Sequence, residues 1–285
     1  MIYWRGARTL KLTKLGAFFA ALILAACSGT PAPPPLQAIK SPTRIGSGQG
    51  IDLATDARDV IHELKNSRVE FVARYYREPE SRWPALSASE ARQLSSQGLK
   101  IVAVWESHSR KPSHFTFSSG YSDAVTAYRE AKAVGQPPGS AIYFAVDFNA
   151  QSEWLPSVNE YFRGIAAGFA AASGGNPQYS VGVYGSGAVC YTLKRNGLAR
   201  YAWLSNSIAW TGSIGYQEWN IRQGGPWPEL SFNHDADEAR NEYGGFQLPD
   251  YEVPNPYPSN ASGDFVEPQF SQNGQPASTT VISSR

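Results

Sequence analysis

The chain has 285 residues, of which 42% are hydrophobic and 17% are charged, and its formal net charge at pH 7 is +1. This composition is typical of a globular protein with a substantial core and excludes a disordered chain. Because the charge is near neutral and the sequence contains no block of like charges, it lacks the basic patch of nucleic-acid-binding proteins, and we expect no nucleic-acid partner.

The first residues have the layout of an export signal. Basic residues precede the apolar run 17–26, which is too short to span a bilayer. The run ends in LAAC at Cys27, and this ending resembles a bacterial lipoprotein signal, in which the cysteine is acylated and becomes the new N-terminus. We therefore expect residues 1–26 to be a lipoprotein signal peptide and Cys27 to be lipidated. An ordinary secretory signal is the alternative.

The residue after the cysteine bears on the destination of the protein. Ser28, rather than Asp, follows Cys27, which resembles lipoproteins that are exported to the outer membrane. We expect an exported protein of the cell envelope, held at a membrane by its N-terminal lipid, in the outer membrane if the source has one.

Two segments without apolar periodicity flank the folded part of the chain. Residues 27–47 are rich in Pro, Ser and Gly, which predicts an extended linker. Residues 247–285 combine recurrent prolines with turn-forming residues, which predicts a disordered tail. The remaining segment, 48–246, contains about 200 residues, near the lower limit for one complete (β/α)₈ barrel.

Strand-like and helix-like patterns alternate along segment 48–246. Residues 55–66 place apolar side chains at the i, i+3, i+4, i+7 spacing of an amphipathic helix. Ser87 and Glu90 have the spacing of a capping box at the start of another helix, which Gly98 can end. Further helices are predicted over 121–135, 158–173 and 186–197, and the eight strand candidates are 50–54, 69–76, 99–106, 140–147, 179–185, 201–207, 218–223 and 232–237.

This alternation predicts the fold class. Continuous apolar strands separated by helices are typical of parallel strands covered by helices. Eight such units fit an α/β protein with a compact, single-domain (β/α)₈ TIM barrel. An open doubly wound sheet is the alternative, but the sequence has no GxGxxG stretch that would support nucleotide binding in it. We expect no cofactor.

The second cysteine is predicted to be structural. Once Cys27 carries lipid, Cys190 is the only free thiol, so no intramolecular disulfide is expected. Cys190 lies in the predicted helix 186–197 beside Val189 and Leu193, which predicts burial in the core. No nearby histidine is present to lower the pKa of its thiol.

Acidic residues occur where several predicted strands end. Asp147 ends strand 140–147, Glu106 ends strand 99–106, and Asp52 lies in the first strand. Because the C-terminal ends of parallel barrel strands meet at one rim, where barrel enzymes carry their active sites, we expect these three side chains to converge. The other polar candidates at this rim are Arg74, Gln223, Asp235 and Asp237, and the aromatic candidates that can stack on sugar rings are Tyr75, Trp105, Tyr184 and Trp203.

A set of motifs resembles the DUF1906 family, the Rv2525c-like glycoside hydrolase-like domains. The matching stretches over about 48–246 are, in order, GIDLATDA, FVARYY, LSASEARQLSSQGLKIVAVWE, GYSDAVTAYREAKAVGQPPGSAIYFAVDFN, YSVGVYG, WLSNSIAW and NHDADEA. The resemblance implies a (β/α)₈ barrel related to the GH25 muramidases, which cut the glycan of peptidoglycan. It also implies functional acids at the end of strand one and in an Asp-x-Glu of strand four. Asp52 and Asp147 match these positions, whereas Asn149 occupies the position of the Glu.

The chemistry expected of this site is glycoside hydrolysis. One carboxylic acid protonates the leaving oxygen, and one carboxylate acts as nucleophile or activates water. We expect Glu106 to be the general acid, because burial and a neighbouring anion would raise its pKa, and Asp147 and Asp52 to stay charged beside Arg74.

Two other functions remain open from the sequence. One is a carbohydrate-binding lipoprotein that has lost turnover, supported by Asn149. The other is a metal hydrolase that uses His108, His114 or His234, although none of these forms an HxxH or HExxH pair. We expect no metal, a monomeric protein, and an envelope glycan or peptidoglycan as the partner.

Overall fold

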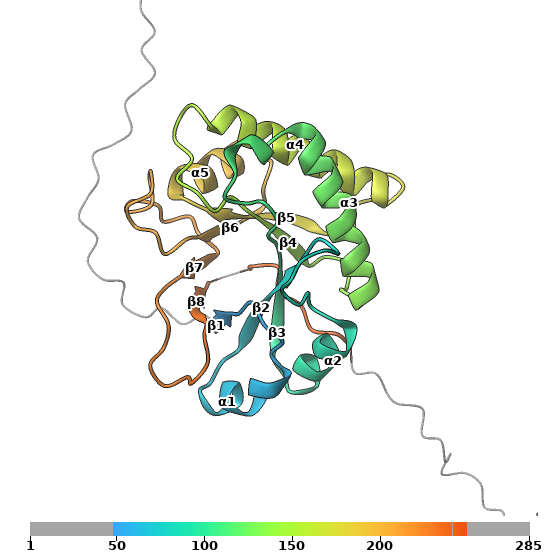
Figure 1. Ribbon diagram of the computed structural model, residues 1–285, viewed down its shortest axis with the longest axis vertical. Helices are drawn as coiled ribbons and strands as arrows, with labels where there is room; N and C mark the ends of the chain where they lie inside the picture. The colour runs from blue at the N-terminus through green and yellow to red at the C-terminus, as the bar shows by residue number, and fades with distance from the viewer. Residues whose placement is uncertain (1–47, 241, 250–285) are drawn as a thin grey trace, which may run out of the picture. The chain divides into compact units, whose positions relative to one another are not determined.

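The computed structural model describes residues 48–240 and 242–249 (Figure 1). Eight strands form one closed barrel in chain order, which confirms the predicted barrel and excludes the open sheet. The strands are β1 (Gln49–Asp52), β2 (Phe71–Tyr76), β3 (Lys100–Trp105), β4 (Ala141–Ala145), β5 (Ser180–Gly185), β6 (Tyr201–Leu204), β7 (Ile221–Gln223) and β8 (Asp235–Ala239).

Each connection between the first six strands contains a helix. The N-terminal cap of the second helix is the one that the sequence predicts: the side chain of Ser87 accepts a hydrogen bond from the Glu90 N–H, as in a capping box. The segments 205–220 and 224–234, which connect β6 to β7 and β7 to β8, contain no helix. The helices are α1 (Ile61–Asn66), α2 (Ala88–Ser96), α3 (Phe117–Val134), α4 (Leu155–Ala172) and α5 (Gly187–Arg195), with short 3₁₀ turns at Arg58–Val60 and Pro112–His114.

The last strand runs against the others. Strands β1 to β7 are parallel to their neighbours in sequence, whereas β8 is antiparallel to both β1 and β7. The expectation of eight parallel strands is therefore wrong for β8. The physical reason is the short connection 224–234, because a parallel return needs a crossover of about a dozen residues or more, usually with a helix. As a result, the first residue of β8, Asp235, lies beside the last residue of β1, Asp52.

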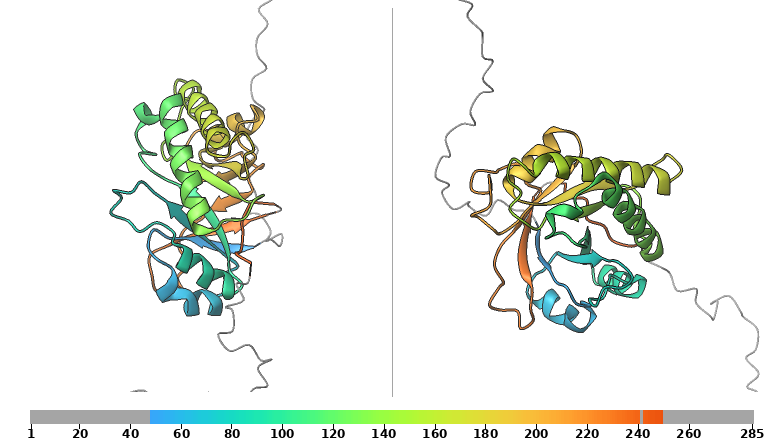
Figure 2. Two further views of the ribbon diagram at one scale, coloured as in Figure 1. Left: turned by 90° about the vertical axis from the view of Figure 1, so that its right-hand side faces the viewer. Right: turned by 45° about the horizontal axis from the view of Figure 1, so that its top comes forward.

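Helices α3 and α4 lie side by side on the outside of the barrel (Figure 2). Their contact depends on glycine. A Cβ atom added at Gly120 would lie 2.0 Å from the carbonyl oxygen of Tyr161, and one added at Gly164 would lie 2.1 Å from that of Phe117. Any other residue would push the two helices apart, so these glycines allow the close packing of α3 against α4.

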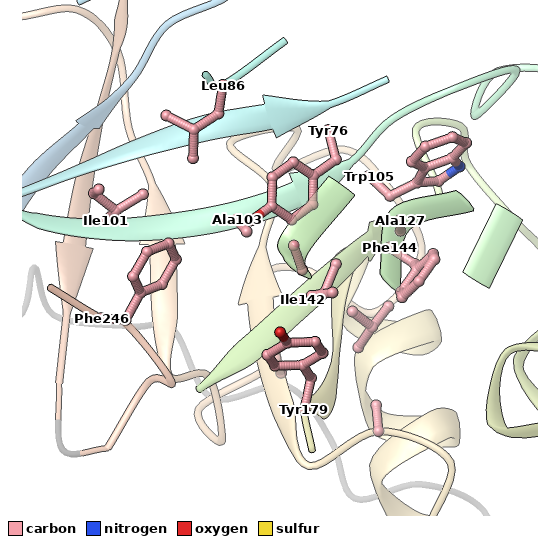
Figure 3. Close-up of a cluster of buried hydrophobic side chains, with 14 of the residues drawn as sticks. Tyr76, Leu86, Ile101, Ala103, Trp105, Ala127, Ile142, Phe144, Tyr179 and Phe246 are labelled. Carbon is pink, nitrogen blue, oxygen red and sulfur yellow. The ribbon is translucent and has the colours of Figure 1, made fainter. Parts of the chain in front are cut away.

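Side chains of alternate strand residues divide the core into two layers. One layer fills the barrel and includes Val102, Tyr143 and Trp203. The other lies between the strands and the surrounding helices and includes Ile101 and Trp105 (Figure 3). This division follows from the period of two along a strand.

A further sequence prediction concerns the cysteine of this core. Cys190 is fully buried, as predicted, and burial raises the pKa of its thiol to about 12. At the end of the barrel opposite the acids, Ile101 and Phe246 lie side by side (Figure 3), and their backbone groups exchange hydrogen bonds of 2.7 and 2.9 Å. The chain remains attached beyond Phe246, because the Leu248 N–H donates to the Ser95 hydroxyl.

The predicted export signal, Cys27, the linker up to residue 47 and the tail from residue 250 lie outside the described residues. Among the helices that are described, none combines the length and apolar character needed to span a bilayer.

Candidate active site

A pocket of about 330 Å³ opens at the rim where β1 to β7 end and β8 begins. Four of its lining residues are acids: Asp52, Glu106, Asp147 and Asp235. The rim thus brings together the three predicted catalytic acids and Asp235 of β8, which was predicted as a further polar residue of the site. The other lining residues are Tyr75, Val104, Arg110, Ala145, Tyr184, Trp203, Asn206, Ser207, Trp210 and Gln223.

Strand alternation explains why Glu106 and Asp147 face the pocket. Val104 and Ala145 point into the barrel at the upper ends of β3 and β4. Glu106 and Asp147 each follow two positions later, so they continue the inward face beyond the last paired residues. Because β3 and β4 are neighbouring parallel strands, the two carboxyl groups share one side of the pocket.

Asp52 is the centre of a hydrogen-bond network. Its Oδ1 accepts a hydrogen bond of 2.9 Å from the Tyr75 hydroxyl, and its Oδ2 accepts one of 2.7 Å from the Gln223 amide. The Gln223 oxygen in turn accepts a 2.9 Å bond from the Tyr184 hydroxyl. Burial raises the pKa of Asp52 to about 7, while these hydrogen bonds oppose the shift. Asp52 can therefore bind a proton close to neutral pH.

Glu106 and Asp147 have different electrostatic surroundings. Burial, followed by the charge of Asp147, raises the pKa of Glu106, in the direction predicted. Asp147 instead has a cationic partner, because Arg110 Nε donates to its Oδ2 over 2.5 Å. The Ser109 hydroxyl donates to Glu106 Oε1 over 3.2 Å. Burial and the neighbouring charge thus favour a proton on Glu106, whereas Asp147 is held by an ion pair.

Arg74 does not lie in the pocket, so this prediction was wrong. Its side chain is fully buried on the outer face of β2, where its Nε forms an ion pair of 2.6 Å with Glu90 and its Nη1 donates to the Leu53 carbonyl over 3.0 Å. The reason is strand alternation: Tyr75 faces the pocket, so its neighbour Arg74 faces the helices. The arginine beside Asp147 is Arg110.

Trp105 and Asp237 are also displaced from the predicted site. Trp105 points outward into the layer beneath the helices (Figure 3), because it alternates with Glu106. Asp237 does point into the barrel, but it lies two residues below Asp235 along β8 and is only 3% exposed. Its Oδ1 accepts a 2.8 Å hydrogen bond from the Trp203 indole, so it lies beneath the pocket rather than in its lining.

Asn149 does not line the pocket but forms hydrogen bonds with a loop that does. Its Oδ1 accepts hydrogen bonds from the Thr211 N–H over 2.8 Å and from the Thr211 hydroxyl over 2.9 Å. Thr211 belongs to the connection 205–220, which supplies Asn206, Ser207 and Trp210 to the pocket. The residue at the position of the expected Glu therefore holds part of the pocket wall in place.

The histidines considered as metal ligands have other contacts. His114 Nε2 lies 2.9 Å from the Asp123 carboxylate, and His234 Nε2 accepts a 3.0 Å hydrogen bond from the Trp227 N–H. In the part of the chain that the structure describes, no three His, Cys, Asp or Glu side chains gather as a metal site requires.

Several pocket residues had not been predicted. Arg110 lies in the loop after β3, and Trp210 lies in the loop after β6. Each follows a strand whose end carries a predicted site residue, which is the signal that points to them. Periodicity does not extend into loops, so the side-chain directions there could not be predicted.

The raised pKa of Asp52 makes the stability of the fold depend on pH. An acid whose pKa is higher in the folded state keeps its proton on folding, so stability falls as pH rises from the unfolded to the folded pKa. Burial raises the pKa of Asp52 from 3.8 to about 7. We therefore expect the free energy of unfolding, measured with urea, to fall as pH rises between these two values.

The contribution of Asp52 is tested by replacement. Asp52→Asn should flatten the pH profile, because the amide does not titrate. Part of the slope should remain, since burial also raises the pKa of Glu130 to about 7. A free energy of unfolding that rises over this range, or an unchanged slope in the variant, would contradict this interpretation.

Comparisons with known proteins identify relatives of the chain. The model of the family described as "Rv2525c-like, glycoside hydrolase-like domain" matches residues 62–248. YbfG of Bacillus subtilis is 33% identical over 123 residues, which are 42% of this chain and 17% of YbfG. FadG of the same organism is 28% identical over 136 residues, which are 46% of this chain and 23% of FadG. The aligned part therefore spans less than a quarter of each of these relatives.

A solved structure has the same fold. The Tat-secreted Mycobacterium tuberculosis protein Rv2525c, in complex with HEPES, aligns with a TM-score of 0.58 at 22% sequence identity. The alignment covers 70% of this chain and 98% of that chain. It therefore includes nearly the whole of the solved domain.

Proposed function

The chain belongs to the Rv2525c-like, glycoside hydrolase-like domain family. We propose that it cleaves an envelope glycan in the acid-lined pocket at the barrel rim, with peptidoglycan as the first candidate substrate. The observation that carries the proposal is the pair Glu106 and Asp147. The two carboxyl groups come from adjacent strands and line one pocket. Of these two, Asp147 has an ion-pair partner among the described residues and Glu106 has none.

The proposed reaction divides the work between these two groups. Glu106, whose pKa is raised by burial and by the charge of Asp147, donates a proton to the glycosidic oxygen as the bond to the leaving sugar breaks. Asp147 attacks the sugar carbon as a carboxylate, or takes a proton from the water that attacks it. Adjacent strands lie about 4.8 Å apart, which is compatible with the carboxyl separation of about 5 to 5.5 Å in retaining enzymes or the wider one of inverting enzymes.

The remaining pocket residues suit a sugar ligand. Tyr75, Tyr184 and Trp210 provide ring faces for stacking, and Asp52 and Gln223 provide groups that bind hydroxyls.

A second candidate function is glycan binding without turnover. Asn149 supports it, because an amide has no acidic proton to donate and its oxygen is already occupied by Thr211. In that case the pocket holds the glycan, and the lipid keeps the protein at the membrane.

One experiment separates the two candidates. The mature chain from residue 28, produced without lipid, is incubated with purified peptidoglycan, and the soluble products are analysed by mass spectrometry. Glycan fragments with new reducing ends would support cleavage. Sedimentation of the protein with peptidoglycan but without released fragments would favour the binding function, and the absence of both would contradict the proposal.

We also propose that the protein is exported and anchored by lipid on Cys27. The LAAC ending supports the lipid, and the description of the relative Rv2525c as Tat-secreted supports export. Cys27→Ala should move the protein from the membrane fraction to the soluble fraction, because one acylated residue provides the anchor. A variant that still sediments with membranes at high salt would contradict the anchor.

A further inference from the structure

A buried carboxyl group lies beneath the proposed catalytic pocket. Asp237 is on the inward face of β8, opposite Gly50 of β1 and Gln223 of β7. Its Oδ1 accepts the hydrogen bond from the Trp203 indole, but its Oδ2 receives no hydrogen bond from any described residue. An ionised carboxylate with an unsatisfied, fully buried oxygen would be costly.

The surroundings of Asp237 contain no compensating charge. The titratable groups that face it are Asp52 on β1, Asp235 on its own strand and Tyr143 on β4. None of these is a cation, and no ion pair among the described residues includes Asp237. Burial, together with the charge of Asp52, holds the pKa of Asp237 well above its usual range.

Besides the Trp203 indole, the Asp52 carboxyl lies within hydrogen-bonding reach of Asp237. Two ionised carboxylates are both acceptors and cannot bond to each other. If Asp237 carries a proton, its hydroxyl donates to Asp52, and the unsatisfied oxygen gains a partner.

We propose that Asp237 is a neutral carboxylic acid that donates a hydrogen bond to Asp52, and that it is a positioning residue of the pocket. Asp52 then receives three hydrogen bonds, from Asp237, Tyr75 and Gln223, and its orientation at the rim is fixed from below and from both sides. The pocket has four carboxyl groups in its lining. Asp237 is a fifth carboxyl group beneath them, and as a neutral acid it adds no negative charge.

The role in glycan handling rests on the proposed function, but the protonation state does not. In the glycan site, a neutral Asp237 lets Asp52 ionise close to neutral pH and accept hydrogen bonds from sugar hydroxyls. A second buried negative charge beneath Asp52 would oppose that ionisation, because like charges at short range cannot both form readily.

The protonation state is testable in the free protein. Carbon-13 NMR of the aspartate carboxyl carbons follows each titration in the mature chain from pH 3 to pH 9. We expect the Asp237 signal, identified by its absence in Asp237→Asn, to show no titration over this range. We expect Asp52 to titrate with a midpoint near 7.

The isosteric variant provides the decisive comparison. Asn reproduces a neutral acid: its oxygen accepts from Trp203 and its amide donates to Asp52. Asp237→Asn should therefore leave the midpoint of Asp52 unchanged. The matched control is Asp235→Asn on the same strand, which removes a real charge near Asp52 and should lower that midpoint.

Two results would overturn the proposal. One is titration of Asp237 with an ordinary aspartate midpoint, about 3.9, which the wild-type spectra alone would reveal. The other is a fall of about 1 to 3 units in the midpoint of Asp52 in Asp237→Asn, as removal of a neighbouring negative charge would cause. Both readouts are independent of glycan cleavage, so they distinguish this proposal from the proposed function.

Discussion

Glu106→Gln is expected to reduce the rate of glycan cleavage by about 10²- to 10⁴-fold, the contribution typical of a general acid. The amide keeps the shape of the side chain but has no acidic proton for the leaving oxygen. Glycan binding should change little, because the variant leaves the Asp52 network and the aromatic walls intact. The measurement is the release of soluble fragments from peptidoglycan, together with sedimentation of each protein with the glycan.

The control for this variant is a glutamate outside the pocket. Glu160 lies on α4, where it pairs with Arg163 on the exposed helix surface, so Glu160→Gln should retain full cleavage. The pH profile adds a second test: loss of the Glu106 proton should account for the fall in rate on the alkaline side of the wild-type profile. Full activity in Glu106→Gln would exclude Glu106 as the acid.

Arg74→Ala is expected to lower the free energy of unfolding by about 3 to 5 kcal/mol, the usual cost of removing one partner of a buried ion pair. Arg74 and Glu90 are both completely buried, and their 2.6 Å contact joins β2 to α2. Removal of the arginine leaves the Glu90 carboxylate buried without its cation, although Glu90 still accepts a hydrogen bond from the Ala57 N–H. Urea denaturation at constant pH measures the loss.

The matched control is the arginine that does lie at the pocket. Arg110 pairs with Asp147, but 80% of its side chain is exposed, so Arg110→Ala should cost at most about 1 kcal/mol of stability. Replacement of the two arginines should thus have different effects: loss of Arg74 destabilises the fold, whereas loss of Arg110 mainly affects the pocket. A stable Arg74→Ala variant would show that the buried pair contributes less than its geometry indicates.

The sequence predicted the strands, the rim and its principal acids because these depend on periodic patterns. Alternation along β3 and β4 was sufficient to place Glu106 and Asp147 on the inward face. The same rule, applied to β2, excludes Arg74 from the pocket once Tyr75 is placed there, and it excludes Trp105 once Glu106 is placed there. Those two predictions are wrong because closeness to a strand end does not determine the direction in which a side chain points.

Other features depend on information that local sequence patterns do not contain. The reversed direction of β8 follows from the short connection 224–234 and from closure of the barrel, which involves residues far apart in the chain. The depth of Asp237 follows from that reversal, because a strand that enters at the rim carries its later residues downward. The contacts of Arg110 and Asn149 depend on loop conformations, which have no repeating pattern.

The most direct test of the central claim, that the acid-lined pocket is a glycan site, is NMR mapping of a soluble peptidoglycan fragment on the mature chain. We expect the largest shifts at Tyr75, Asn206 and the Trp210 indole, whose signal is identified with Trp210→Phe, because all three line the pocket. This result does not depend on turnover. The opposite end of the barrel, where β3 and β4 begin, carries Tyr243 beside Lys100. A fragment that leaves the pocket signals unchanged, or that shifts residues around Tyr243, would contradict the account.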